Sequence, residues 1–328
     1  MKKTKFLLPL IFIMAIMVGS VNKIYAQDTE IATTEFDKLV NYIETNANFI
    51  NGDLATLIVN AGEVKDNLKN EKYLVIDIRS ESWFEYGHIK NAKNVKAAEL
   101  LNFFKNDIKP ADFEKIVMVC YSGQSASYFA SLLRLAGYDN VYSMQYGMSS
   151  WRLDFAENAW LKNIKDDFAG KLETTENARP EKGAEPVINT GKTEPKEILE
   201  ARVSEIMAKP YSDFTVKTED VFANPGNFYV VDYASADDYN KGHIPGAVLY
   251  GPGCFAADKG LLTLPTDKKI AVYSMTGLES AYIVAYLNVL GYDVANIPYG
   301  NNGFMNSELK GHKDGFTKKQ INTYPVVE

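Results

Sequence analysis

The chain has 328 residues, which is enough for two domains of ordinary size, each with its own hydrophobic core. Hydrophobic residues make up 46% of the chain and charged residues 23%, a composition that excludes the disordered and fibrous classes. The formal net charge of −7 disfavours contact with nucleic acid and with anionic membrane surfaces, so we expect neither as a partner.

The first 26 residues have the pattern of a secretory signal. Lysines precede an apolar run from Phe6 to Val21, and Ala26 stands before polar residues. The alternative is a retained membrane anchor, but the run is short for a span of about 20 residues and contains Pro9. We therefore expect cleavage after Ala26, export to the periplasm or the exterior, and no stable membrane association afterwards. Removal of four lysines takes the net charge from −7 to −11.

The chain contains an internal repeat. YLVIDI at 73–78 and FYVVDY at 228–233 are β-branched and aromatic runs typical of buried parallel strands. Each is followed by Gly-His-Ile, which begins at Gly87 in one copy and at Gly242 in the other. A second apolar strand comes next, IVMVC at 116–120 and IAVYS at 270–274.

A helix follows each of these second strands, over Ala126–Leu135 and over Ser280–Leu290, and a glycine ends each helix. Strand, helix and strand in this order predict a parallel sheet with helices on both faces. The sequence therefore predicts an α/β chain of two similar domains, each a small parallel sheet flanked by helices on both faces.

The predicted boundaries follow the repeat. We expect a first domain over 31–172 with its core at about 62–165, and a second over 196–328 with its core at about 215–310. Between them, residues 173–195 are rich in Glu, Thr, Lys and Pro without hydrophobic periodicity, and predict a solvated linker. Helices at 35–47 and 195–209 open the two domains and are expected to serve packing.

Cys120 and Cys254 are the two cysteines, and they occupy non-equivalent places in the two copies. Exported proteins often pair their cysteines, but this placement makes a disulfide the weaker expectation. Cys120 ends a parallel strand directly before a helix, where ligands bind in open α/β sheets. Backbone N–H groups and the helix N-terminus would favour its thiolate. The alternative is a cysteine that is merely buried at a strand end.

The loop after Cys120 has the side chains of an anion-binding turn. Gly123 permits a positive φ, and the hydroxyls of Ser122 and Ser125 can donate to an anion or a terminal sulfur. We therefore expect Cys120 to be a nucleophile, with Tyr121, Ser122, Gly123, Gln124 and Ser125 as the substrate-binding loop.

These motifs together resemble those of the rhodanese sulfurtransferases. The resemblance rests on Asp77-Ile78-Arg79, on residues 85–89, on the loop 120–126, and on Gly137–Val141 and Gly147–Trp151, with weaker counterparts in the second copy. It implies a rhodanese-like fold and a persulfide intermediate on Cys120. It also implies transfer of a sulfane sulfur from a small donor such as thiosulfate to cyanide or a thiol, with a protein acceptor as a further option. This chemistry requires no metal and no organic cofactor.

The loop departs from the family pattern at Gln124 and Ser125, where members often carry an arginine or lysine. A persulfide or polysulfide donor is therefore as well supported as thiosulfate. Arg79 could supply the missing charge to the substrate, but a pair with Glu81 or Glu85 is the stronger expectation.

Asp77 and His88 are expected to support the loops around the site. The aspartate can accept backbone N–H bonds and the histidine can hold its own loop. His88 as a general base is the alternative, but it recurs as His243 in the copy that lacks a nucleophile.

The second copy has Ser274 in place of the cysteine and Ala234 in place of the arginine, so we expect it to be inert in sulfur transfer. Its expected role is to pack on the first copy and close one wall of the cleft, with Cys254 as a bystander. A cysteine phosphatase is excluded, because it needs an arginine six residues after the nucleophile and Ala126 stands there. A non-catalytic persulfide carrier, redox sensor or partner-docking module is the remaining alternative.

Overall fold

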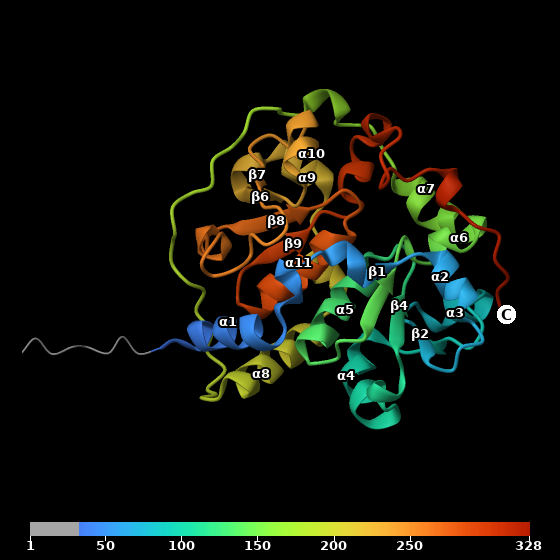
Figure 1. Cartoon of the computed structure of the whole chain (residues 1–328). Coiled ribbons are helices and arrows are strands. Elements are labelled where there is room, and N and C mark those ends of the chain that lie inside the picture. Colours follow the sequence, from blue (N-terminus) through green and yellow to red (C-terminus); the bar gives the residue numbers. More distant parts are fainter. Residues whose placement is uncertain (1–32) are drawn as a thin grey trace, which may run out of the picture. The chain divides into compact units, whose positions relative to one another are not determined.

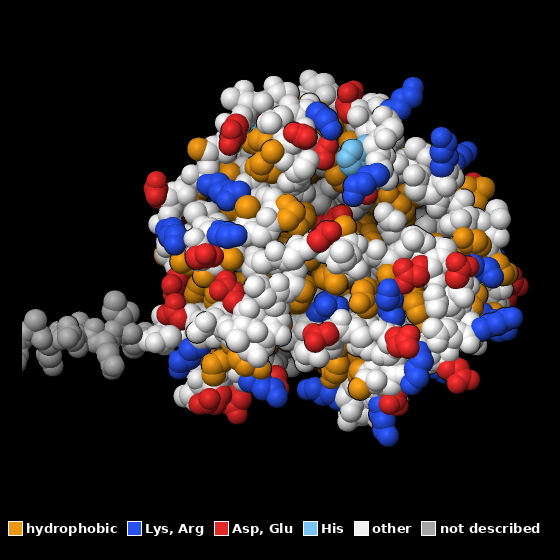
Figure 2. Space-filling model, in the orientation of Figure 1, with side chains coloured by type: hydrophobic (Ala, Val, Ile, Leu, Met, Phe, Trp, Pro, Cys, Tyr) orange, Lys and Arg blue, Asp and Glu red, His pale blue; other side chains and the backbone are white. Residues whose placement is uncertain are grey.

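The computed structural model describes residues 33–328 (Figure 1). The expected signal peptide at 1–26 lies outside the described residues. No helix within 33–328 combines the length and the apolar character that a membrane crossing requires. On the face seen in Figure 2, basic and acidic side chains are interspersed without a large patch of one sign.

Two parallel sheets organise the described chain. The first has the strand order β1-β5-β4-β2-β3 and the second the order β7-β6-β8-β9, and all pairings are parallel. The strands are β1 Ile58–Val59, β2 Tyr73–Asp77, β3 Lys93–Asn94, β4 Lys115–Val119, β5 Val141–Met144, β6 Phe228–Asp232, β7 Val248–Leu249, β8 Lys269–Tyr273 and β9 Val294–Asn296. The prediction of two similar α/β units is confirmed.

Helices cover both faces of each sheet, as predicted. They are α1 Glu35–Asn46, α2 Ala61–Asp66, α3 Glu81–Tyr86, α4 Leu100–Asn102, α5 Gln124–Leu135, α6 Leu153–Asn158, α7 Trp160–Asn163, α8 Pro195–Met207, α9 Thr218–Ala223, α10 Ala236–Lys241 and α11 Leu278–Val289. The start of α1 is set by Thr34, which forms a capping box with Asp37. α5 ends at Leu135 with Ala136 as its C-cap, and Gly137 follows with a φ of 95°, which fits a glycine-terminated helix.

The two copies pack through α5 and α11, which lie between the sheets (Figure 1). Ser131 on α5 donates to the carbonyl of Tyr282 on α11 at 2.8 Å, and the Tyr282 hydroxyl donates to the Leu57 carbonyl of the first copy at 3.1 Å. Apolar side chains of both copies belong to one buried cluster. The second copy therefore packs on the first, as expected, and the loops before the two helices meet.

The last residues of each copy pack against the other copy and hydrogen-bond to it. The Lys165 amide donates to Asn302 at 3.0 Å, and residue 173 pairs with His243 in an antiparallel bridge. In return, Asn322 donates to Ser150 at 3.0 Å and Val327 pairs with His88. This exchange of terminal segments ties the two copies together, and the domain boundaries given above stay a prediction.

Candidate functional site

Cys120 lies directly after β4, in the loop that leads into α5. The Gly123 amide donates to Cys120 Sγ, with N and S 3.1 Å apart. Gly123 has a φ of 90°, and a Cβ there would lie 2.9 Å from the Met144 carbonyl oxygen, so the turn requires glycine. The cysteine is 2% exposed. The loop thus aims a backbone donor at a shielded sulfur.

A second turn, residues 147–150, packs against the cysteine loop and hydrogen-bonds to it. Met148 donates its amide to the Cys120 carbonyl at 2.9 Å, and Ser149 Oγ donates to the Tyr121 carbonyl at 2.9 Å. Gly147 has a φ of 54°, and a Cβ there would come within 2.4 Å of the Cys120 carbonyl oxygen. Because no side chain fits at Gly147, the two turns pack backbone against backbone.

The predicted substrate-binding residues of the loop differ in their contacts. The Tyr121 hydroxyl lies 3.2 Å from both the amide and the Oγ of Ser80. Gln124 is buried and bridges the copies, because its Oε1 accepts the Tyr299 amide at 2.9 Å while its Nε2 donates to Ser122 Oγ at 3.3 Å. Ser122 and Ser125 are half-buried in the loop. Gln124 therefore positions the loop against the second copy.

Arg79 pairs with Asp77, so the expected pair with Glu81 or Glu85 is wrong. Its Nη2 lies 2.7 Å from Asp77 Oδ2 and 2.8 Å from the Gly87 carbonyl, and both side chains of the pair are buried. A buried guanidinium needs a buried counter-charge, whereas glutamates 81 and 85 stay exposed. Asp77 also accepts the Arg79 amide at 3.0 Å. Binding of a donor by Arg79 stays a prediction.

His88 has the contacts of a loop support. Its Nδ1 lies 2.9 Å from the Phe84 carbonyl, its ring stacks on Phe84 with centroids 3.8 Å apart, and its backbone pairs with Val327. His243 repeats this arrangement on Tyr239, with Nδ1 2.8 Å from the carbonyl and ring centroids 3.7 Å apart. Both histidines hold the same turn in their own copies.

The second copy satisfies its buried aspartate differently. Asp232 corresponds to Asp77, but its partner is the Tyr273 hydroxyl, which donates to Oδ2 at 2.8 Å and accepts the Ile244 amide at 3.2 Å. Tyr273 stands where the first copy has Val119, so the loss of the arginine at Ala234 is matched by a tyrosine on the next strand. Burial raises the pKa of Asp232 to about 7, with Asp238 adding to the rise and the Tyr273 hydrogen bond opposing it.

Ser274, the counterpart of the nucleophile, is hydrogen-bonded to neighbouring side chains. Its hydroxyl donates to Glu279 at 3.1 Å and lies 3.3 Å from Ser280 Oγ. Burial raises the pKa of Glu279, and nearby Asp314 adds to the rise. Ser274 accepts an amide from Ser280 at 3.3 Å but has no histidine among these partners. The Ser274 hydroxyl thus forms its hydrogen bonds within its own turn and the helix that follows.

Aromatic side chains form a wall against the loop that follows Cys120 and against α5. Trp160 is fully buried, donates Nε1 to the Ser122 carbonyl at 2.9 Å and meets the Tyr299 ring at a centroid distance of 5.0 Å. Burial raises the pKa of Tyr299 to about 12; interaction with Cys120 adds to the rise and a hydrogen bond with Ser122 opposes it. Burial likewise raises the pKa of Tyr211, where the Asn296 hydrogen bond opposes and Cys120 adds to the rise. The second copy thus supplies two tyrosines to this wall: Tyr299, and Tyr211, whose ring packs on Tyr128 of α5 with centroids 5.2 Å apart.

No pattern in the sequence marks these wall residues. Tyr299 belongs to a repeated Tyr-Gly pair, 146–147 and 299–300. Both tyrosines have a positive φ, which the structure shows and the sequence does not indicate. Nothing in the sequence around Tyr211 indicates that it approaches Cys120.

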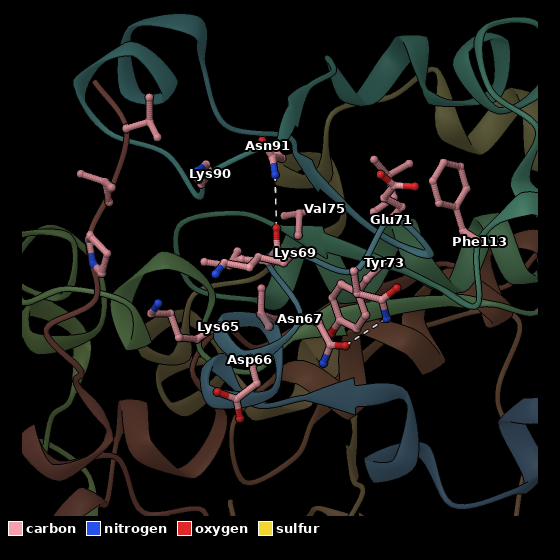
Figure 3. Close-up of a pocket in the computed structure, with 17 residues that line it drawn as sticks. Lys65, Asp66, Asn67, Lys69, Glu71, Tyr73, Val75, Lys90, Asn91 and Phe113 are labelled. Carbon is pink, nitrogen blue, oxygen red and sulfur yellow. Dashed lines mark hydrogen bonds between the residues drawn. The ribbon is translucent and has the colours of Figure 1, made fainter.

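The two cysteines are free, as expected. Cys254 is half-buried and accepts a hydrogen bond from Arg179 Nη2 at 3.1 Å. A separate cavity of about 1100 Å³ lies between α2, the start of β2 and the C-terminal residues 325–327 (Figure 3). Lysines 65, 69 and 90 line one side of it, and Tyr73 and Phe113 the other. It contains no residue of the Cys120 loop.

Comparison with known proteins gives a family match in each copy. The rhodanese-like domain model matches residues 60–154 and 219–307. Among curated relatives, the thiosulfate sulfurtransferase GlpE of Shewanella oneidensis is 38% identical over 78 residues, which covers 24% of this chain and 73% of that protein. The protein of the same name from Pseudoalteromonas translucida is 29% identical over 99 residues, covering 30% and 91%.

Solved structures of two sulfurtransferases are also similar, at low scores. Thiosulfate sulfurtransferase from Pseudomonas aeruginosa is 15% identical with a TM-score of 0.29, and the match covers 90% of this chain and 48% of that one. The 3-mercaptopyruvate sulfotransferase SseA from Escherichia coli is 17% identical with a TM-score of 0.27, covering 76% and 98%. The family match therefore rests on the sequence.

Proposed function

Because the chain belongs to the rhodanese-like domain family, with one matching domain in each copy, we propose that it is a sulfurtransferase with Cys120 as its persulfide-forming residue. The observation that carries the proposal is the amide of Gly123 aimed at Cys120 Sγ from 3.1 Å. Curated relatives named as thiosulfate sulfurtransferases support sulfur transfer in general.

The proposed reaction has two steps. The Cys120 thiolate attacks the outer sulfur of the donor; a new S–S bond forms, the donor's bond to that sulfur breaks, and its electron pair leaves with sulfite or a thiolate. An acceptor nucleophile then attacks the outer sulfur, and the electron pair returns to Cys120 as thiolate. The Gly123 amide stabilises negative charge on the sulfur in both steps.

The surroundings of Cys120 favour small donors. The cysteine is 2% exposed, and the aromatic wall against its loop and α5 is formed by Trp160, Tyr211 and Tyr299. Arg79 is already neutralised by Asp77. Since the loop itself carries no cation, we propose persulfide or polysulfide donors beside thiosulfate, with cyanide or a thiol as the acceptor and a protein thiol as a further candidate.

The second copy is proposed to be inert in sulfur transfer, because Ser274 is tied to Glu279 and Ser280 and is a far weaker nucleophile than a thiolate. Export is a separate proposal that rests on residues 1–26 alone. The N-terminal sequence of the protein recovered from the producing cell tests it: a start at Gln27 supports export, and a retained Met1 or Lys2 contradicts it.

Turnover separates an enzyme from a carrier. The protein is incubated with thiosulfate or polysulfide and then with cyanide, and released thiocyanate is measured. We expect repeated turnover by the wild type and by Cys254→Ser and Ser274→Ala, and none by Cys120→Ser. A single sulfur transferred per chain without repeated turnover would support the carrier instead, and activity retained in Cys120→Ser would overturn the proposal.

A further inference from the structure

Tyr211 of the second copy has a hydroxyl hydrogen with no acceptor among residues 33–328. Its oxygen accepts Asn296 Nδ2 at 2.7 Å. Asn296 is fully buried and its orientation is fixed, because Nδ2 also donates to the Gly277 carbonyl at 3.0 Å while Oδ1 accepts Ser280 Oγ at 2.6 Å. A phenol whose oxygen already accepts one bond still has its own hydrogen to donate.

The packing around Tyr211 places that hydrogen near the cysteine loop. The Tyr211 ring packs on Tyr128 of α5, with centroids 5.2 Å apart, and belongs to the shell of the buried cluster that contains Cys120. Gly277, which shares the Asn296 amide with Tyr211, faces Gln124 of the cysteine loop; a Cβ on Gly277 would lie 2.9 Å from Gln124 Oε1. Cys120 also adds to the rise of the Tyr211 pKa, after burial, which agrees with this placement.

The hydroxyl does not bond the cysteine itself. Within the described chain, Cys120 Sγ accepts the Gly123 amide, and no hydrogen bond joins it to Tyr211. A persulfide places a second, negatively charged sulfur beyond Sγ, further from the backbone that holds it. That outer sulfur needs a donor, and the half-buried Tyr211 hydroxyl has a hydrogen that no acceptor among residues 33–328 takes up.

We propose that Tyr211 donates a hydrogen bond to the outer sulfur of the Cys120 persulfide. The inference rests on the sulfur transfer proposed above and deepens it. The copy without a nucleophile then contributes a catalytic side chain to the site of the other copy. Asn296 is a positioning residue, because it holds the phenol oxygen and leaves the hydrogen free.

The test measures how stable the persulfide is, rather than how fast it turns over. The full chain is equilibrated with thiosulfate and sulfite at a series of ratios, and the fraction with one added sulfur is measured by intact mass spectrometry. Tyr211→Phe keeps the ring and removes the hydroxyl. A hydrogen bond to a charged group is stronger than one between neutral groups. We therefore expect that half of the Tyr211→Phe chains carry the added sulfur only at a thiosulfate-to-sulfite ratio about tenfold higher than for the wild type.

Tyr286→Phe is the matched control, because Tyr286 is a buried tyrosine of α11 whose hydroxyl bonds the Phe255 carbonyl at 3.3 Å within the second copy. We expect its half-conversion ratio to equal that of the wild type, while thermal unfolding shows both variants folded. An unchanged ratio in Tyr211→Phe would overturn the inference, as would a tenfold change in Tyr299→Phe alone. Absence of any persulfide in the wild type would instead overturn the proposed function.

Discussion

The second copy has Ala234 where the first has Arg79, so its buried Asp232 lacks a cationic partner within residues 33–328. We predict that Asp232 makes the free energy of unfolding depend on pH. Its carboxyl is 1% exposed, and its Oδ1 has no hydrogen-bond partner among the described residues. Burial raises its pKa from 3.8 to about 7, whereas unfolding returns it to the ordinary value. Between these two values the folded chain binds more protons than the unfolded chain, so the free energy of unfolding falls as pH rises.

The magnitude follows from the shift. Each unit of pKa difference corresponds to about 1.4 kcal/mol, so this carboxyl alone lowers the free energy of unfolding by about 3 kcal/mol between pH 5 and pH 8. Asp232→Asn removes the titration and keeps an oxygen that can accept the Tyr273 hydroxyl. The variant should therefore gain stability relative to wild type by about 3 kcal/mol over this pH range, whatever its stability at pH 5.

Urea unfolding of both proteins at pH 5, 6, 7 and 8 measures the difference. Asp237→Asn, on the exposed surface of α10, controls for the change in net charge. A difference between wild type and Asp232→Asn that stays constant within about 1 kcal/mol from pH 5 to pH 8 would refute the reasoning, because the carboxyl would then titrate alike in both states.

Three other changes probe the cysteine loop and its support. Arg79→Met strands the buried carboxylate of Asp77 and should lower the free energy of unfolding by about 3–5 kcal/mol in urea titration; a loss below about 1 kcal/mol would contradict a buried pair. Gln124→Ala leaves a second-copy amide unpaired and should cost about 1–3 kcal/mol in the same assay, with no loss counting against the bridge. Gly147→Ala places a Cβ against the Cys120 carbonyl and should abolish thiocyanate release, so that wild-type activity would contradict the tight turn.

The repeated local patterns predicted the architecture well, because they depend on neighbouring residues. The strands at 73–78 and 116–120 and the helix after Cys120 all appear within two residues of their predicted bounds. A continuous apolar run and a glycine at a helix end are properties of short segments, and the residue type of Gly123 alone indicates a turn with a positive φ.

Long-range choices could not be predicted in the same way. Arg79 has acidic residues on both sides in sequence, and only the buried position of its side chain selects Asp77. The role of Tyr273 depends on a neighbouring strand, and Tyr211 comes to the site from a segment 91 positions beyond Cys120. The exchange of segments at 165–173 and 322–328 has no local pattern, because it depends on the surfaces of the other copy.

The central claim is that Cys120 carries the transferred sulfur. It is tested most directly by peptide mass spectrometry of the wild-type protein after polysulfide treatment and alkylation of remaining thiols. We predict one added sulfur on the peptide that contains Cys120 and none on the peptide that contains Cys254. An added sulfur on Cys254 with Cys120 unmodified would contradict the account.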